Sequence, residues 1–111
     1  MFKQGDIVLL YFPFSDLSGG KRRPALILSS GLVNATPDLV CVQITSKKFY
    51  DNLFFELAKS AVSPPLILNS GIRIHKLFTA EQRLVSKKIG ILNPESLKTV
   101  LRLINEKVFE L

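Results

Sequence analysis

The chain has 111 residues, of which 47% are hydrophobic and 22% charged, a balance that predicts one folded domain over residues 1–111 rather than a disordered chain. The formal net charge of +6 at pH 7 favours an anionic partner, with nucleic acid and acidic proteins as the main candidates and a membrane surface as the third. A membrane span is not expected, because Pro13 interrupts the longest apolar run and a span needs about 20 residues.

The chain up to Leu92 predicts a succession of short strands. Runs rich in apolar, β-branched and aromatic residues indicate strands at Ile7–Phe12, Ala25–Ser29, Val40–Thr45, Asn52–Leu57, Gly71–Leu77 and Lys88–Leu92. The segments 15–21, 31–38 and 58–70 between them are rich in turn residues and predict a surface loop, a turn and a loop. Ile7–Phe12 is apolar throughout, so we expect this strand to be buried on both faces.

The spacing of the apolar residues changes after Leu92. Asn93 is a favourable N-cap, Pro94 fits the first helical position, and Glu95 suits the positive end of the helix dipole. The apolar residues that follow have the spacing of an amphipathic helix: Leu97, Val100, Leu101, Ile104 and Val108. Short strands and one packed helix predict a mainly β fold, in which a strongly bent antiparallel sheet or small barrel carries a C-terminal helix.

The densest charged motif, Gly19-Gly20-Lys21-Arg22-Arg23-Pro24, precedes the second predicted strand. Arginine presents its donors as a planar fork that matches phosphate oxygens, and Pro24 disfavours a helical conformation for Arg23. We therefore expect an extended Arg23, with Lys21 and Arg22 beside it, to contact phosphate; a solvated basic turn is the alternative. The motif is not a Walker A loop, because Ser15 and Arg22 stand where that loop needs glycine and Ser or Thr.

A second polar group stands at the end of the third predicted strand. Strand alternation places Cys41, Gln43 and Thr45 on one face, and the run Ser46-Lys47-Lys48 follows. These side chains are candidates for holding a phosphodiester, whereas a strand that simply ends at the surface is the alternative. Cys41 lies within an apolar run and predicts a buried small hydrophobic residue rather than a nucleophile. A single cysteine excludes an internal disulfide and fits a reducing compartment, so we expect the cytoplasm.

Arg73 and His75 form the third candidate, two residues apart on one face of the fifth predicted strand. Histidine can exchange a proton near pH 7, and a nearby arginine can stabilise a developing anion. A structural role for both is the alternative. The chain has one histidine and no His-Glu-x-x-His or Cys-x-x-Cys motif, so no metal site is expected. Most aromatic residues are expected in the core, with Phe14 and Tyr50 as candidate platforms for stacking RNA bases.

Several of these segments together resemble the MazF/PemK (Kid) toxin family. The resemblance covers nearly the whole chain and is carried by Gly5–Leu10, Pro13–Asp16, Lys21–Leu28, Val42–Ser46, Ile72–Thr79 and the terminal helix. It implies an SH3-like barrel with an added C-terminal helix, a homodimer, and a sequence-specific endoribonuclease of a toxin–antitoxin module. It also implies cleavage of single-stranded RNA without metal or other cofactor, by attack of the 2′-hydroxyl on the adjacent phosphate. The extended, acidic C-terminal segment of a cognate antitoxin would block the groove.

The resemblance also implies roles for individual residues. Arg23 matches the family's arginine before proline and would stabilise the phosphorane, with proton donation as a second role. Thr45 matches a threonine at a strand end that would orient the phosphate, and Arg73 matches an arginine of the Kid-like branch. At the position of His75 related members commonly carry a carboxylate, so this sequence departs from the family there. Histidine can serve as the base, since its ordinary pKa is about 6.5.

Two other functions are compatible with the same sequence. A module that binds RNA without cutting it would use Arg23 only as a phosphate contact. A CcdB-like inhibitor of DNA gyrase would share the fold and act by protein contact. The end of the chain, Val108-Phe109-Glu110-Leu111, lacks the tryptophan-containing tail of those inhibitors, which disfavours the second alternative.

Overall fold

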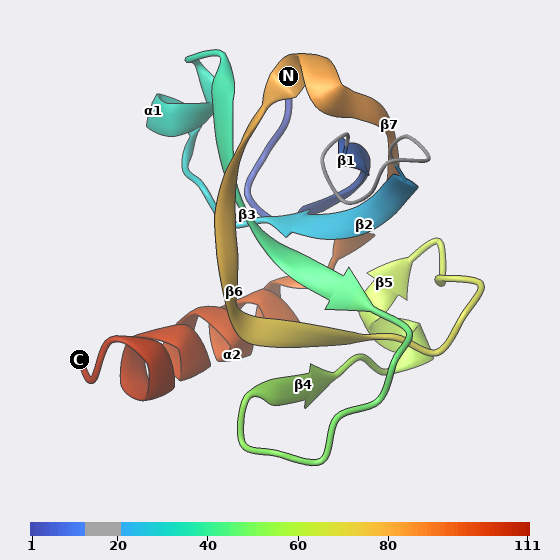
Figure 1. The fold of residues 1–111 in the computed structure, drawn as a ribbon, viewed down its shortest axis with the longest axis vertical. Coiled ribbons are helices and arrows are strands. Elements are labelled where there is room, and N and C mark those ends of the chain that lie inside the picture. The colour runs from blue at the N-terminus through green and yellow to red at the C-terminus, as the bar shows by residue number, and fades with distance from the viewer. Residues whose placement is uncertain (13–20) are drawn as a thin grey trace.

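Seven strands form one sheet in the computed structural model of the chain, which describes residues 1–12 and 21–111. Across the sheet the order is β4-β6-β3-β2-β1-β7-β5, and each neighbouring pair is antiparallel. The strands are β1 (Asp6–Phe12), β2 (Lys21–Ile27), β3 (Asp38–Thr45), β4 (Phe54–Glu56), β5 (Val62–Ser63), β6 (Gly71–Glu81) and β7 (Val85–Leu92). Figure 1 shows the sheet curled strongly on itself, which confirms the predicted bent antiparallel architecture.

The C-terminal helix crosses one side of this curled sheet (Figure 1). α2 spans Pro94–Leu103 and continues as a π-helical turn over Ile104–Val108. The side-chain oxygen of Asn93 accepts a hydrogen bond from the backbone N–H of Ser96 at 2.8 Å, so the predicted N-cap is confirmed. The other helical segments are short: α1 (Gly31–Asn34) and the 3-10 turns Lys59–Ala61 and Gln82–Leu84. Within the described ranges no helix is long and apolar enough to cross a membrane.

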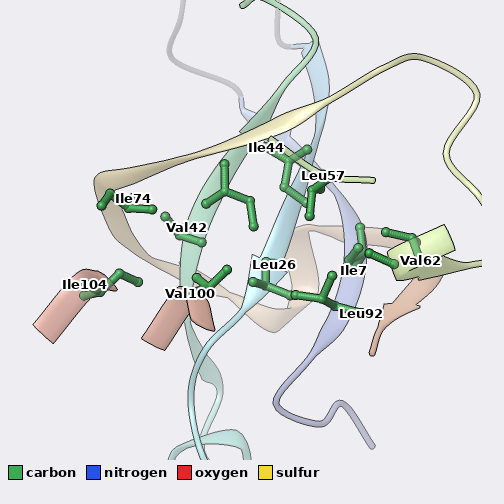
Figure 2. Packing of buried hydrophobic residues seen from close by; sticks show 12 residues of the cluster. Ile7, Leu26, Val42, Ile44, Leu57, Val62, Ile74, Leu92, Val100 and Ile104 are labelled. Atoms are coloured by element: carbon green, nitrogen blue, oxygen red, sulfur yellow. The ribbon is translucent and has the colours of Figure 1, made fainter. Parts of the chain in front are cut away.

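The curled sheet has two hydrophobic clusters, one on each face. The larger cluster lies between the sheet and α2 and contains Val100 and Ile104 of the helix region (Figure 2). The smaller cluster contains Val8, Leu10 and Cys41 on the opposite face. Ile7 belongs to the larger cluster and Val8 to the smaller, so the first half of β1 is buried on both faces, as its apolar sequence predicts. The prediction fails at the end of the strand, where Tyr11 is exposed.

The start of β2 differs from the prediction. The structure begins this strand at Lys21 rather than Ala25, because residues 21–26 pair with Ile7–Phe12 of β1. Pairing with β3 begins only at Ala25, so on that edge no strand of the described residues pairs with the segment 21–24. Pro24 cannot donate to a ladder and is tolerated at such an open edge. The basic residues of the motif therefore lie on a strand, while its glycines and Phe14 lie outside the described residues.

Four other expected loops or strands also differ from the prediction. A one-turn helix, α1, occupies the predicted turn 31–38, and the short strand β5 lies within the predicted loop 58–70. β6 continues four residues beyond the predicted end at Leu77, because its second half pairs with the first half of β3. β7 begins at Val85 rather than Lys88, where it pairs with Leu10 of β1. For β5, β6 and β7 the partner strand, which is distant in sequence, decides the boundary.

β6 bends sharply near its start, as Figure 1 shows. Ile72 pairs with Ile44 and Leu77 pairs with Val42, so residues 73–76 of β6 lie opposite Gln43 alone in β3. This irregularity frees the backbone of residues 73–76 from regular pairing with β3, and the N–H of Ile74 instead donates to the carbonyl oxygen of Leu53 at 3.0 Å. The bend therefore carries Arg73 and His75, two of the predicted site residues.

Candidate active site

A groove of about 600 Å³ lies between the open ends of β2 and β3 and the loop that follows β5. Its walls include five apolar residues from five different segments: Leu9, Pro24, Ile44, Leu66 and Ile89. Its polar side chains are those of Arg22, Arg23, Thr45, Ser46, Ser70 and Lys87. Four of these six were predicted from the two strand ends, so the structure brings the two predicted polar segments together.

Arg22 and Arg23 are held at the groove by strand pairing. In the register of β1 and β2, Arg22 lies opposite Tyr11 and Arg23 opposite Leu10. Both arginines are exposed, and neither makes an ion pair with any residue of the described ranges. Since no carboxylate in the ranges 1–12 and 21–111 pairs with them, the two guanidinium groups are free, within this part of the chain, to bind an incoming anion.

Thr45 ends β3 at the edge of the groove. Its hydroxyl oxygen accepts a hydrogen bond from the backbone N–H of Lys47 at 3.1 Å, which turns the chain at the strand end and brings Ser46 to the groove. A threonine hydroxyl has one proton to donate in addition to its acceptor sites. Thr45 can therefore donate its proton to an oxygen of a bound phosphate while it keeps this turn closed.

Two features of the groove were missed in the sequence. Lys87 lies opposite Leu9 in the register of β1 and β7 and adds a third cation. The segment 64–68 forms a wall, on which Ile67 is 95% exposed and Leu68 is 63% exposed. Alternation along the last strand could have singled out Lys87, whereas the position of a loop between short strands depends on distant contacts.

Arg73 and His75 do not line this groove. They lie at the bend of β6, where the guanidinium of Arg73 donates from Nη1 to both carboxylate oxygens of Asp51, at 2.9 and 3.2 Å. The Cζ atom of Arg73 lies 3.9 Å from the centre of the Phe49 ring, and only 8% of the arginine side chain is exposed. We refer to Phe49, Asp51, Arg73 and His75 as the β6 cluster.

Gly71 allows an aromatic pair, Phe49 and Phe54, to pack closely on β6; we refer to this pair as the aromatic cover of the β6 cluster. A Cβ atom at Gly71 would lie 2.1 Å from Cζ of Phe54, so only glycine leaves room for this ring. The centre of the Phe54 ring is 6.0 Å from that of Phe49, the ring on which Arg73 stacks. The aromatic pair therefore lies over the outer face of β6 and excludes water from the arginine stem.

His75 is a neutral imidazole near pH 7 in this environment. Its Nδ1 atom is buried and has no hydrogen-bond partner in the described part of the chain, so a proton there would be buried unpaired. Burial, and next the positive charges of Arg73 and Lys76, lower the pKa of His75, while the charge of Asp51 opposes this shift. The hydrogen bond from Arg73, first among several causes, lowers the pKa of Asp51, which is therefore a carboxylate. The β6 cluster thus contains a neutral base beside an ion pair.

The remaining predicted site residues lie outside the groove. Lys47 and Lys48 are exposed, with Nζ atoms 5.2 and 5.5 Å from the ring centres of Phe49 and Tyr50. Lys21 is exposed at the start of β2, and Gln43 is half-buried opposite Ala25.

Among the other candidates of the sequence, Tyr50 is 89% exposed, which keeps it available as a stacking platform. Cys41 is fully buried, and burial raises the pKa of its thiol to about 12. This cysteine is therefore a core residue and no nucleophile. In the ranges 1–12 and 21–111 no three His, Cys, Asp or Glu side chains form a group that could hold a metal ion.

Comparisons with solved structures agree with this fold. The endoribonuclease in complex with its cognate antitoxin from a Mycobacterial species has a TM-score of 0.78 at 17% identity, with 98% of this chain and 96% of that chain covered. MazF in a MazE-MazF crystal structure from Deinococcus radiodurans has a TM-score of 0.80 at 19% identity, with 97% and 96% covered. The Mycobacterium tuberculosis toxin MazF-mt6 has a TM-score of 0.75 at 19% identity, with 96% and 97% covered.

Sequence comparison gives the family itself. A search of curated proteins gives no match. Residues 3–108, which include both the groove and the β6 cluster, match the family model of PemK-like, MazF-like toxins of type II toxin–antitoxin systems. The chain therefore belongs to this toxin family.

Proposed function

We propose that the chain is the toxin of a type II toxin–antitoxin module and acts in the cytoplasm as an endoribonuclease on single-stranded RNA, including mRNA. The observation that carries this proposal is the groove, in which Arg22 and Arg23 make no ion pair with the described residues and the Thr45 hydroxyl lies at the same edge. Membership of the family and the likeness to a Mycobacterial endoribonuclease support it. We further propose that neither a metal nor another cofactor is needed, because the substrate supplies its own nucleophile.

In the proposed reaction the ribose 2′-oxygen forms a bond to the adjacent phosphorus, and the bond from phosphorus to the 5′-oxygen breaks. The products are a 2′,3′-cyclic phosphate and a 5′-hydroxyl. Arg23 stabilises the charge that develops on the phosphorane oxygens, and Thr45 orients the phosphate by donating its proton. One proton leaves the 2′-hydroxyl for a base, and Arg23, in the second role that the resemblance implies, gives one to the departing 5′-oxygen.

His75 is the proposed base, with Arg73 beside it. Its lowered pKa leaves the imidazole free to accept a proton at neutral pH. Thr45 pairs with Gly71, and Arg73 follows two residues further along β6, about 7 Å away at the usual rise of a strand. An RNA strand that leaves the groove at Thr45 can therefore continue to the β6 cluster. Ser46, Lys47 and Lys48 follow Thr45 directly in the chain and would contact the RNA there, while Lys21 on β2 and Gln43 on β3 are further proposed RNA-binding residues.

An antitoxin is the proposed protein partner. The groove combines cations with apolar walls and an exposed apolar rim at Ile67 and Leu68. An extended acidic segment with apolar side chains would match both features, and the Deinococcus and Mycobacterial neighbours were solved with MazE and with a cognate antitoxin. We also expect a homodimer, since a mean hydropathy of +0.26 is high for a small monomeric domain. Light scattering on purified protein measures this directly.

The test of the proposed function is cleavage of a long single-stranded RNA in EDTA, followed by analysis of the ends. Wild type, Arg23→Ala, His75→Ala and the control Arg102→Ala are compared, since Arg102 is an exposed arginine on α2 paired with Glu106. We expect cuts at defined sites with 2′,3′-cyclic phosphate ends from wild type and Arg102→Ala, and greatly slowed cleavage by the other two. If folded wild type binds RNA without cutting it, the proposed nuclease function is wrong and the chain is an RNA-binding module. Inhibition of DNA gyrase without effect on RNA would favour the CcdB-like function.

A further inference from the structure

Asp51 is the carboxylate of the β6 cluster and the ion-pair partner of Arg73. It lies in the loop between β3 and β4, and its Oδ1 atom accepts hydrogen bonds from Nη1 of Arg73 and from the backbone N–H of Leu53, both at 2.9 Å. The same loop is tied to the C-terminal helical region, because Nζ of Lys107 donates to the carbonyl oxygen of Asn52 at 3.1 Å. Asp51 is therefore held in place from two sides.

Arg73 depends on this carboxylate. The arginine side chain is 92% buried, its Nε atom is buried and has no hydrogen-bond partner among the described residues, and Asp51 is the ion-pair partner that they offer it. A buried guanidinium without a counter-ion is costly. Without the Asp51 charge we expect Arg73 to be held less firmly against the Phe49 ring, while its own charge stays beside His75.

The charges around His75 depend on the same contact. Arg73 and Lys76 on β6 and Asp51 on the loop act on the imidazole, and Lys107 is the cation that the helical region brings to this loop. Removing the charge of Asp51 takes away a negative group and also leaves the charge of Arg73 uncompensated. Both changes disfavour the imidazolium form of His75, so they act in the same direction.

We propose that Asp51 is the positioning residue of the β6 cluster: it holds Arg73 against Phe49 and supplies the negative charge that balances the two cations beside His75. Its part in cleavage rests on the proposed function, whereas its effects on Arg73 and His75 do not. Asp51 does not line the groove, so it would act on the reaction through Arg73 and His75.

The test uses Asp51→Asn, which keeps the shape and the acceptor oxygen but removes the charge. Asp51→Glu restores the charge, and Asp38→Asn is the control, since Asp38 is an exposed carboxylate at the other end of β3. His75 is the single histidine of the chain, so in tag-free protein one imidazole NMR signal reports its titration without ambiguity. RNA cleavage is measured over the same pH range.

We expect the titration midpoint of His75 to fall in Asp51→Asn, to stay at the wild-type value in Asp38→Asn, and to return towards it in Asp51→Glu. Cleavage by Asp51→Asn should be on the order of 10–100-fold slower, with its acid limb moved to lower pH. Equal midpoints in wild type and Asp51→Asn overturn the proposal, and so does an unchanged rate and pH profile. If wild type does not cleave RNA, the proposed function fails, while the titration still decides whether Asp51 acts on His75.

Discussion

The groove and the β6 cluster both contain arginine, but they present it in opposite ways. Arg22 and Arg23 are exposed on the open edge of β2, and they make no ion pair with the described residues. Arg73 is 92% buried, bound to Asp51 and stacked on Phe49. An exposed, unpaired guanidinium is available for ligand, whereas a buried and paired one is already satisfied and contributes to packing.

Because of this difference, we expect the groove arginines to contribute to ligand binding and Arg73 to contribute to the stability of the fold. A substitution in the groove should reduce activity and leave the fold intact, because no described residue relies on those charges. A substitution in the β6 cluster should affect stability as well, because ring, carboxylate and guanidinium support one another. The following variants measure each side of this comparison.

The largest effect is expected for Arg23→Ala in the groove. Removing a donor that stabilises charge in the transition state costs about 100–1,000-fold in rate in comparable sites. The free energy of unfolding should change by no more than about 0.5 kcal/mol, as is usual for exposed positions. Single-turnover cleavage and urea unfolding of the same preparation provide both values. A rate within threefold of that of Arg102→Ala, at about equal stability, would remove Arg23 from the active site.

Arg73→Ala tests the other side of the comparison. We expect the free energy of unfolding to fall by about 2–4 kcal/mol, because the stacked arginine stem is lost and Asp51 is left without its cation. The free energy of unfolding should fall less in Arg73→Met than in Arg73→Ala. Methionine fills most of the space of the arginine stem, and the substitution removes the unpaired Nε atom. Urea unfolding measures both variants. If Arg73→Ala were as stable as Arg23→Ala, the two regions would not differ in the way described.

Gly71→Ala tests the aromatic cover of the β6 cluster without changing any charge. The added methyl group would lie 2.1 Å from the Phe54 ring, so the ring must shift, at a cost of about 1–3 kcal/mol. Gly31→Ala is the matched control, because a Cβ there meets nothing within 4 Å. Thermal unfolding of both variants gives the difference. Equal melting temperatures would mean that the Phe54 ring moves aside at little cost and that its packing on Gly71 does not stabilise the β6 cluster.

The predictability of the two regions differs for a physical reason. The groove could be largely predicted, because Arg22, Arg23, Thr45 and Ser46 stand at strand ends that local sequence patterns indicate. The helix and its Asn93 cap were predicted for the same reason, since a cap is a local interaction. Alternation also placed Arg73 and His75 on one strand. The burial of Arg73 could not be predicted, because it depends on Asp51 from a distant loop and on the bend of β6 opposite Gln43.

The smallest effect is expected for Lys87→Gln, on the affinity for RNA. This variant tests whether RNA binds along the groove or across the β6 cluster. Each phosphate contact on a single strand contributes about −0.7 to the slope of log K against log salt concentration. We therefore expect the slope to become shallower by about 0.7 in Lys87→Gln, with a few-fold lower affinity. Fluorescence anisotropy with 2′-O-methyl RNA, which supplies no 2′-hydroxyl, measures binding alone. Lys98→Gln on α2 is the control and should keep the wild-type slope. A shallower slope in Lys76→Gln but not in Lys87→Gln would place the RNA backbone beside His75 and remove the groove as its main binding surface.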